Sequence, residues 1–190
     1  MQIPYFGVTV VAYVLAHGLT TMIITPVQAR LLPEVTSFAS LLYLPHGVRV
    51  LATWLLGRAA IPALCVGAFL SECIFADAGI GSASEPMVLI SILIGAVAAP
   101  VAFELMRAFG FNLYAKERLR VHWKWLLLVG MLASVINSVG QSLVFSGVIL
   151  SNWSAVVLVA YAVGDLFGLI ATTLILMLVF RWLRADRARG

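Results

Sequence analysis

Residues 87–109 read MVLISILIGAVAAPVAFELMRAF, and no charged residue of this run comes before Glu104. The length matches the roughly 20 apolar residues that an α-helix needs to cross the hydrocarbon core of a bilayer. A crossing segment finds no water there, and a helix satisfies its backbone polar groups internally. The stretch therefore predicts a membrane-spanning helix, and further apolar stretches lie on both sides of it.

The composition of the whole chain agrees with this interpretation. Of its 190 residues, 63% are hydrophobic and only 11% are charged, and the mean hydropathy is +1.07. Soluble domains carry about 25% charged residues, and disordered chains combine low hydrophobicity with high charge, so both classes are excluded. We predict an all-α protein, a polytopic transmembrane helical bundle in which residues 1–190 form a single integral membrane domain. The length leaves almost no room for a soluble kinase, cyclase or nucleotide-binding domain.

The apolar stretches predict about six spans in the lipid bilayer. Pro26 is expected to close the first span, and Pro45 falls in the middle of the second. The expected spans are Tyr5–Thr25, Val35–Gly57, Ala60–Ala76, Met87–Phe109, Lys124–Leu150 and Trp153–Leu183.

Lysine and arginine indicate the orientation, because cytoplasmic loops carry an excess of both. One cluster lies between the fourth and fifth spans and another in the C-terminal tail, and we expect both to be cytoplasmic. Six spans then place the N- and C-termini in the cytoplasm. Arg58 agrees with this orientation and Arg30 does not. The net charge of +4 is thereby explained without nucleic acid as a partner. The clusters consist of Lys116, Arg118, Arg120 and Lys124, and of Arg181, Arg184, Arg187 and Arg189.

Several polar residues fall at mid-membrane depth when counted from the span ends. A charge at this depth costs at least about 2.5–3.5 kcal/mol. Arg49 and Asp165 lie there in spans of the same direction, and an unpaired buried arginine costs far more than a bidentate pair, so the two are natural partners. Either Arg49 binds an anionic ligand that Asp165 helps to hold, or the two form a structural ion pair. His17, Asn137 and Gln141 lie at a similar depth.

The sequence Leu44-Pro45-His46-Gly47 interrupts the second span. Proline removes one helical hydrogen bond and clashes with the preceding turn, and it suits the first position of a new helix. A half-helix that starts at Pro45 would direct free N–H groups at an anion. Arg49 would lie one turn further on the same face, with His46 adjacent. Broken helices at mid-depth are typical of membrane binding sites, and a simple proline kink is the alternative.

The fifth span carries small residues at four-residue intervals, which allow another helix to approach closely. Packing within the bundle is the favoured interpretation, and docking of a protein partner on this face is an alternative. Asn137 and Gln141, at positions i and i+4, either cross-link helices or line a cavity. In the sixth span, Gly164 and Gly168 would let a neighbouring helix come close to Asp165. The small residues of the fifth span are Gly130, Ser134, Ser138, Ser142 and Ser146.

Motifs of catalysis do not occur in the sequence. No base, nucleophile and orienting group are spaced as a triad requires, and there is no HExxH, GxSxG or phosphate-loop motif. His17 and His46 could ligate a haem, but two isolated histidines are weak support. We therefore predict a protein that is not an enzyme and that uses no cofactor and no metal.

Residues 43–57, Tyr-Leu-Pro-His-Gly-Val-Arg-Val-Leu-Ala-Thr-Trp-Leu-Leu-Gly, resemble the aromatic-x-Pro-x-Gly and Leu-Leu-x-Gly signature of the membrane-associated sensor family (the MASE domain, first type). Ile61–Leu70 is similar to that family's Pro-x-x-x-x-Gly stretch, and Gly164–Gly168 to its Gly-Asp-x-x-Gly motif. The resemblance covers about residues 35–175. It implies a multi-pass sensory or regulatory module of a bacterial inner membrane, which binds a small ligand and signals through a membrane or cytoplasmic protein partner.

Two other functions stay open. The size and the six-span count are also similar to the substrate-binding components of vitamin transporters, which implies small-molecule transport. A structural or assembly subunit of a membrane complex is the third alternative. If a pocket exists, we expect its ligand to be small and anionic. The expected ligand-binding residues are His17, Pro45, His46, Arg49, Asn137, Gln141 and Asp165.

Overall fold

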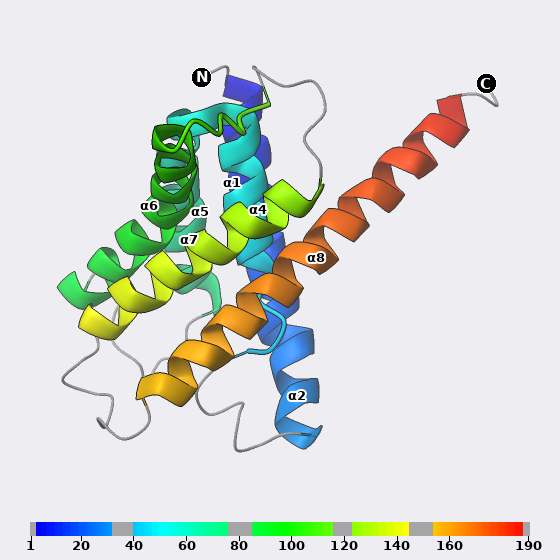
Figure 1. Cartoon of the computed structure of the whole chain (residues 1–190). Coiled ribbons are helices and arrows are strands. Elements are labelled where there is room, and N and C mark those ends of the chain that lie inside the picture. Colours follow the sequence, from blue (N-terminus) through cyan, green and yellow to red (C-terminus); the bar gives the residue numbers. More distant parts are fainter. Residues whose placement is uncertain (1–2, 32–39, 76–84, 116–122, 145–153, 188–190) are drawn as a thin grey trace.

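The computed structural model describes residues 3–31, 40–75, 85–115, 123–144 and 154–187. Within these ranges every regular element is a helix, which confirms the all-α prediction (Figure 1). The elements are α1 (Ile3–Leu19), the π-helical turn η1 (Thr20–Ile24), α2 (Thr25–Leu31), α4 (Leu44–Leu56), the 3₁₀ turn η2 (Gly57–Ala59), α5 (Ala60–Phe75), α6 (Pro86–Ala108), α7 (Trp123–Val144) and α8 (Ser154–Arg187).

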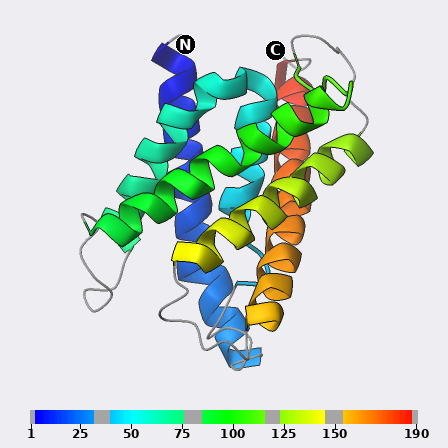
Figure 2. The same ribbon diagram turned by 60° about the vertical axis from the view of Figure 1, so that its left-hand side comes forward.

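Five helical stretches of the described residues are long and apolar enough to cross a membrane, so by length and composition this is a multi-pass membrane protein. The stretch Leu44–Phe75 folds back at Gly57, whose φ of +63° is a left-handed conformation that favours glycine. Figure 2 shows α4 and α5 as antiparallel neighbours joined by this turn. The α4 helix has 13 residues and is therefore about 20 Å long, shorter than the roughly 30 Å of hydrocarbon in a bilayer.

The bounds of α5, α6 and α8 are close to those predicted. Within the predicted second span, residues 40–43 are not helical and α4 begins at Leu44, next to Pro45. Some predictions concern parts of the chain outside the described residues. These are the first part of the second span at 35–39, the end of the fifth span at 145–150 with Ser146, the loops at 77–84 and 116–122 with Lys116, Arg118 and Arg120, the turn at 150–153, and Arg189.

The prediction that Pro26 ends the first helix is wrong, since helical structure continues through η1 and α2 to Leu31. A proline inside a regular α-helix clashes with the carbonyl four residues earlier. Here a wider π turn precedes the proline, and the Thr25 N–H donates to the Thr20 carbonyl, one residue further back than in an α-helix. Pro26 then lies in the first turn of α2, where a missing N–H is tolerated.

The segment Ser40–Tyr43, here called the strap, is non-helical and leads into α4. The Leu41 N–H donates to Gln28 Oε1 of α2 at 2.7 Å, and the Tyr43 N–H donates to the Gly164 carbonyl of α8 at 3.0 Å. The strap therefore connects the first helical stretch with the last one.

Two glycines of α8 make room for the strap. A Cβ atom on Gly164 would meet the backbone carbonyl of Ser40, and one on Gly168 would meet the backbone carbonyl of Tyr43. The close approach expected at this glycine pair is thus made by a non-helical backbone segment and not by a helix.

The Thr20 hydroxyl joins the π turn to the start of α4. Its Oγ1 donates to the Ala16 carbonyl at 2.9 Å and accepts from the buried Leu44 N–H at 3.3 Å. Thr20→Val leaves that N–H without an acceptor, so we expect a loss of about 1–2 kcal/mol, measured as a lower Tm in detergent. Thr21→Val is the matched control, because the Thr21 hydroxyl bonds to carbonyls of its own helix. Equal losses in the two variants would contradict this role of Thr20.

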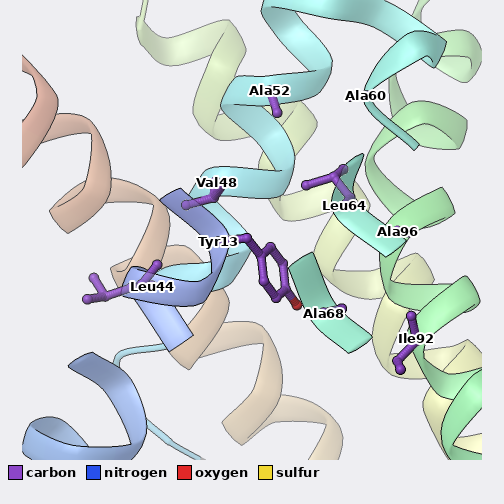
Figure 3. Packing of buried hydrophobic residues seen from close by; sticks show 10 residues of the cluster. Tyr13, Leu44, Val48, Ala52, Ala60, Leu64, Ala68, Ile92 and Ala96 are labelled. Atoms are coloured by element: carbon purple, nitrogen blue, oxygen red, sulfur yellow. The ribbon is translucent and has the colours of Figure 1, made fainter. Parts of the chain in front are cut away.

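Two hydrophobic clusters meet at α4. The first lies between α1, α4, α5 and α6, with Tyr13 at its centre (Figure 3). The second lies between α4, α6, α7 and α8. The α4 helix contributes Val48 to the first cluster and Val50 to the second, and every residue from Leu44 to Thr53 is buried. A charged side chain on this part of α4 is therefore enclosed by the bundle.

Candidate ligand-binding site

A polar cavity of about 200 Å³ lies between the helices. It is bounded by α1, by the strap and by α4 through α8, so each of these helices contributes at least one residue. A cavity of about 150 Å³ accepts a benzene-sized molecule, so this one has room for a small metabolite. The lining residues are Tyr13, Ser40, Tyr43, Arg49, Ala68, Glu72, Ser91, Ile92, Asn137, Gln141, Tyr161 and Asp165.

Arg49 places a buried positive charge on the cavity wall, with 7% of its surface exposed. Its Nη2 donates to the Tyr13 hydroxyl at 2.7 Å. Its Cζ lies 5.5 Å from the ring centroid of Tyr13 and 5.6 Å from that of Tyr43, a cation–π arrangement with both. The guanidinium forms no ion pair with a described residue, and its buried Nε has no hydrogen-bond partner there. Its charge therefore lacks a direct carboxylate counter-ion.

Gly95 of α6 provides the space for this guanidinium. A Cβ atom at position 95 would lie 2.6 Å from Arg49 Nη2 and 2.8 Å from its Cζ. These atoms are the far end of a flexible side chain, so a methyl group there would move the guanidinium and leave the α6 backbone in place. Gly95 therefore fixes where the positive charge lies in the cavity.

His46 links α4 to two other helices. Its Nε2 lies 3.0 Å from the Gly130 carbonyl of α7, and its Nδ1 lies 3.4 Å from Asp165 Oδ2 of α8. A carbonyl only accepts, so Nε2 carries a proton and donates it. Neither Nδ1 nor Oδ2 forms a hydrogen bond with a described residue, and His46 is the described group that lies at ion-pair distance from the Asp165 carboxyl. The contact therefore holds α4 and α8 together and keeps Asp165 beside His46.

The expected ion pair between Arg49 and Asp165 is not formed. Asp165 faces His46 instead, and the Arg49 guanidinium is held by Tyr13. Arg49 and Asp165 nevertheless line the same cavity from α4 and α8, while His46 lies behind Asp165, outside the lining. The cavity thus separates the two residues that we expected to neutralise each other directly.

Gln141 of α7 and Ser91 of α6 connect their helices at the cavity wall. Ser91 Oγ donates to Gln141 Oε1 at 2.8 Å, and Gln141 Nε2 donates to the Ser91 carbonyl at 3.0 Å. The same Nε2 lies 3.4 Å from Asn137 Oδ1. Gln141 therefore both cross-links helices and lines the cavity. No described residue accepts from the Asn137 amide nitrogen, which leaves that donor for a ligand.

His17 lies beside the cavity and not on its wall. Its ring centroid is 6.5 Å from that of Tyr13, 6.4 Å from that of Tyr43 and 5.9 Å from that of Phe75. Because Tyr13 and Tyr43 line the cavity, His17 packs behind these two rings. His17 therefore contacts residues that line the cavity but does not line it itself.

Pro45 also lies outside the cavity lining, in the first turn of α4. The anion site expected at this helix start is not made of free N–H groups. The Leu44 N–H donates to Thr20, and the His46 N–H donates to the Tyr43 carbonyl at 3.2 Å. The break in the second span thus positions Arg49, and the protein itself occupies the donors at the helix end.

The small residues of α7 face the interior of the bundle. Gly130, Ser134 and Ser138 are buried, and a Cβ atom on Gly130 would meet the side chain of Leu169 in α8. These three residues are therefore closed to an external protein partner and pack within the bundle, while Ser142 is half-buried and Ser146 lies outside the described residues.

Eight lining residues are additions to those expected from the sequence. For two of them helical spacing offers a signal, since Tyr13 precedes His17 by one turn and Tyr161 precedes Asp165 by one turn. Glu72 is a carboxylate within the predicted third span, and that charge is itself a signal of a site. The eight additional residues are Tyr13, Ser40, Tyr43, Ala68, Glu72, Ser91, Ile92 and Tyr161.

A second polar cluster closes the end of the bundle at the α4–α5 turn. Arg58 Nη2 lies 2.9 Å from Glu104 Oε2, and the Tyr114 hydroxyl donates to Glu104 Oε1 at 2.9 Å. Burial, together with this hydrogen bond, raises the pKa of Tyr114, so its phenol stays protonated at neutral pH. The Arg58 side chain is 71% exposed. The cluster therefore lies at the surface and connects the α4–α5 turn with α6.

Among the described residues, no three His, Cys, Asp or Glu side chains gather as ligands for a metal ion. The cavity instead offers a ligand one guanidinium, carboxylates, phenols and amides. Comparison of the chain with protein-family models, with curated proteins and with solved structures found no match. The resemblance to the membrane-associated sensor family stays a prediction.

Proposed function

We propose that this chain is a non-enzymatic membrane module that binds a small ligand through an anionic group at Arg49. The observation that carries the proposal is a buried guanidinium on the wall of a polar cavity, with no carboxylate partner in the part of the chain that the structure describes. A buried charge without a counter-ion is costly, and an anionic ligand group would offset that cost. An arginine also offers two parallel donors to a carboxylate or a phosphate.

We further propose six passes through a bacterial inner membrane, with both termini in the cytoplasm. The start of α1, the α4–α5 turn, the end of α6 and the end of α8 lie at one end of the bundle, at the top of Figures 1 and 2. Basic residues gather at this end, and cytoplasmic ends are rich in them. The basic residues there are Arg58, Arg107, Lys124 and Arg181.

The proposed role is sensory or regulatory, with a protein partner that reads the helix arrangement. A ligand in the cavity would contact α1 and α4 through α8 together, so it would favour the packing that suits it best. The α8 helix has 34 residues and is about 50 Å long, and its C-terminal half leaves the bundle in Figure 1. This half of α8 would transmit a change in the position of Asp165 to a protein partner.

The non-helical strap within the predicted second span favours a second candidate, a substrate-binding component of a transporter. In transporters, helices interrupted near the bilayer midplane border the substrate site, and the strap and α4 do so here. Uptake of the identified ligand into proteoliposomes, alone or with a partner, would support transport. Binding without uptake would support the sensory role.

A thermal-stability screen tests the proposed site. Wild type and the variants Arg49→Gln and Gly95→Ala would be melted in mild detergent with carboxylates, phosphates, vitamins and haem. A ligand at 100 times its Kd adds about 2.7 kcal/mol of stability, and we expect this gain in wild type and its loss in Arg49→Gln. Gly95→Ala keeps the charge but moves it, so binding should weaken about tenfold or more while the ligand-free Tm changes little.

The screen also has an outcome that would overturn the proposal. If no compound stabilises wild type, and Arg49→Gln itself melts far below it, then Arg49 is a structural residue. The chain would then be better explained as an assembly subunit of a membrane complex.

A further inference from the structure

We propose that the ligand of the central cavity is a small zwitterion, with its anionic group at Arg49 and its cationic nitrogen at Glu72. This inference rests on the proposed function, because it assigns a ligand class to the same cavity. It also replaces the plain anion expected from the sequence with a ligand that carries both charges.

The charges on the cavity wall lead to this assignment. Arg49 is buried, carries one positive charge and has no carboxylate partner among the described residues. Asp165 faces His46 at ion-pair distance, with 3.4 Å between Oδ2 and Nδ1. Glu72 lines the cavity one turn after Ala68 on α5, is half-buried, and has neither an ion pair nor a hydrogen bond with a described residue. One positive and one negative group on the walls of one cavity thus remain without partners among the described residues.

The charges on the cavity wall then determine which charges a ligand should carry. In a partly buried site of low dielectric, like charges repel far more strongly than in water. A plain anion at Arg49 would share the cavity with the Glu72 carboxylate, and a plain cation at Glu72 would share it with the guanidinium. A zwitterion offers each wall group its opposite charge and adds no net charge to the cavity.

The remaining walls suit such a ligand. Tyr13 and Tyr43 hold the guanidinium from two sides, so its position is set before the ligand arrives. Asn137 offers an amide donor that no described residue accepts, and Tyr161 offers a phenol on the cavity wall. A volume of about 200 Å³ is somewhat more than a benzene-sized molecule needs, which points to a small α-amino acid or a betaine.

The test uses matched probes that differ by one charge. Binding of three amino acids to the purified protein in lipid nanodiscs would be compared with binding of their deaminated acids and decarboxylated amines. The sets are alanine, propionate and ethylamine; leucine, 4-methylpentanoate and isopentylamine; and proline, cyclopentanecarboxylate and pyrrolidine. At least one amino acid should bind about tenfold or more tightly than both of its matched partners, as expected for one additional charge-assisted contact.

Variants then assign each charge to a wall group. In Glu72→Gln, a nearly isosteric change that breaks no contact, we expect the amino acid to lose its advantage over the deaminated acid. In Arg49→Lys binding should weaken, and in Arg49→Gln both the amino acid and the acid should stop binding. Glu85→Gln is the matched control, because Glu85 precedes α6 outside the cavity, and it should bind like wild type.

The outcomes separate this inference from the proposed function. If a deaminated acid binds as tightly as its amino acid and still requires Arg49, the zwitterion is wrong and the Arg49 site stands. The same conclusion follows if only an anion from the wider screen binds. If Glu72→Gln keeps the full preference for the amino acid, the assignment of Glu72 is wrong. If nothing in either panel binds wild type, both proposals fail.

Discussion

Gly168→Ala should destabilise the protein by about 3 kcal/mol or more, and the folded protein is expected to be recovered in low yield. The added methyl group would meet the backbone carbonyl of Tyr43. Overpacking usually costs about 1–3 kcal/mol, and more when the neighbour cannot move. Tyr43 cannot easily move, because its N–H is bonded to Gly164 at 3.0 Å. At about 2–4 °C per kcal/mol for a chain of this size, the Tm should fall by about 6–12 °C or more.

Gly7→Ala is the matched control for this variant. Gly7 lies in α1, and a Cβ atom there would meet nothing within 4 Å. Alanine is a better helix former than glycine by about 1 kcal/mol, so this variant should be as stable as wild type or slightly more stable. If Gly168→Ala and Gly7→Ala have the same Tm, the contact between the strap and α8 is looser than described.

The second large effect is expected at the pair of His46 and Asp165. His46→Leu removes the described group that lies at ion-pair distance from the buried Asp165 side chain, which is 2% exposed. Breaking a buried pair by removing one partner costs about 3–5 kcal/mol, because the other charge is left without compensation. We expect a loss of about 3 kcal/mol in thermal or denaturant unfolding of the detergent-solubilised protein.

A second substitution should restore much of that loss. In the background of His46→Leu, Asp165→Asn removes the uncompensated carboxylate, so the double variant should melt above His46→Leu. Asp165→Asn alone should cost little, because an asparagine amide can donate to Nδ1 of His46. A double variant that is less stable than His46→Leu would mean that Asp165 is not held by His46.

The sequence predicts the helices of this protein better than their arrangement around the bundle axis. Apolar length decides where α5 and α6 begin and end, because a span needs about 20 apolar residues whatever its neighbours are. Pro45 marks the break before α4 because a proline acts locally. The prediction that Pro26 ends the first helix is wrong because the π turn that begins at Thr20 lets the helix continue past the proline.

The candidate site shows the same limit. Counting from span ends places Arg49 and Asp165 at one depth, and both do line the cavity. Depth alone does not say which way a side chain points around its helix, and one residue rotates that direction by about 100°. His46 therefore takes the place beside Asp165 that we expected Arg49 to hold. That Arg49, Asn137, Gln141 and Asp165 bind a ligand stays a prediction.

The hydrogen bond from Thr172 to the Leu44 carbonyl, 3.1 Å long, joins residues 128 positions apart. During synthesis at about 5–20 residues per second, the chain around Arg49 leaves the ribosome on the order of ten seconds before the helix that completes its surroundings. Until then the guanidinium must remain in a partly assembled membrane protein. Tyr13, made earlier, already offers its hydroxyl and its ring to Arg49. The first helix thus stabilises the arginine while the rest of the protein is being made. A nascent chain that stops before α8 cannot bind a ligand in the cavity.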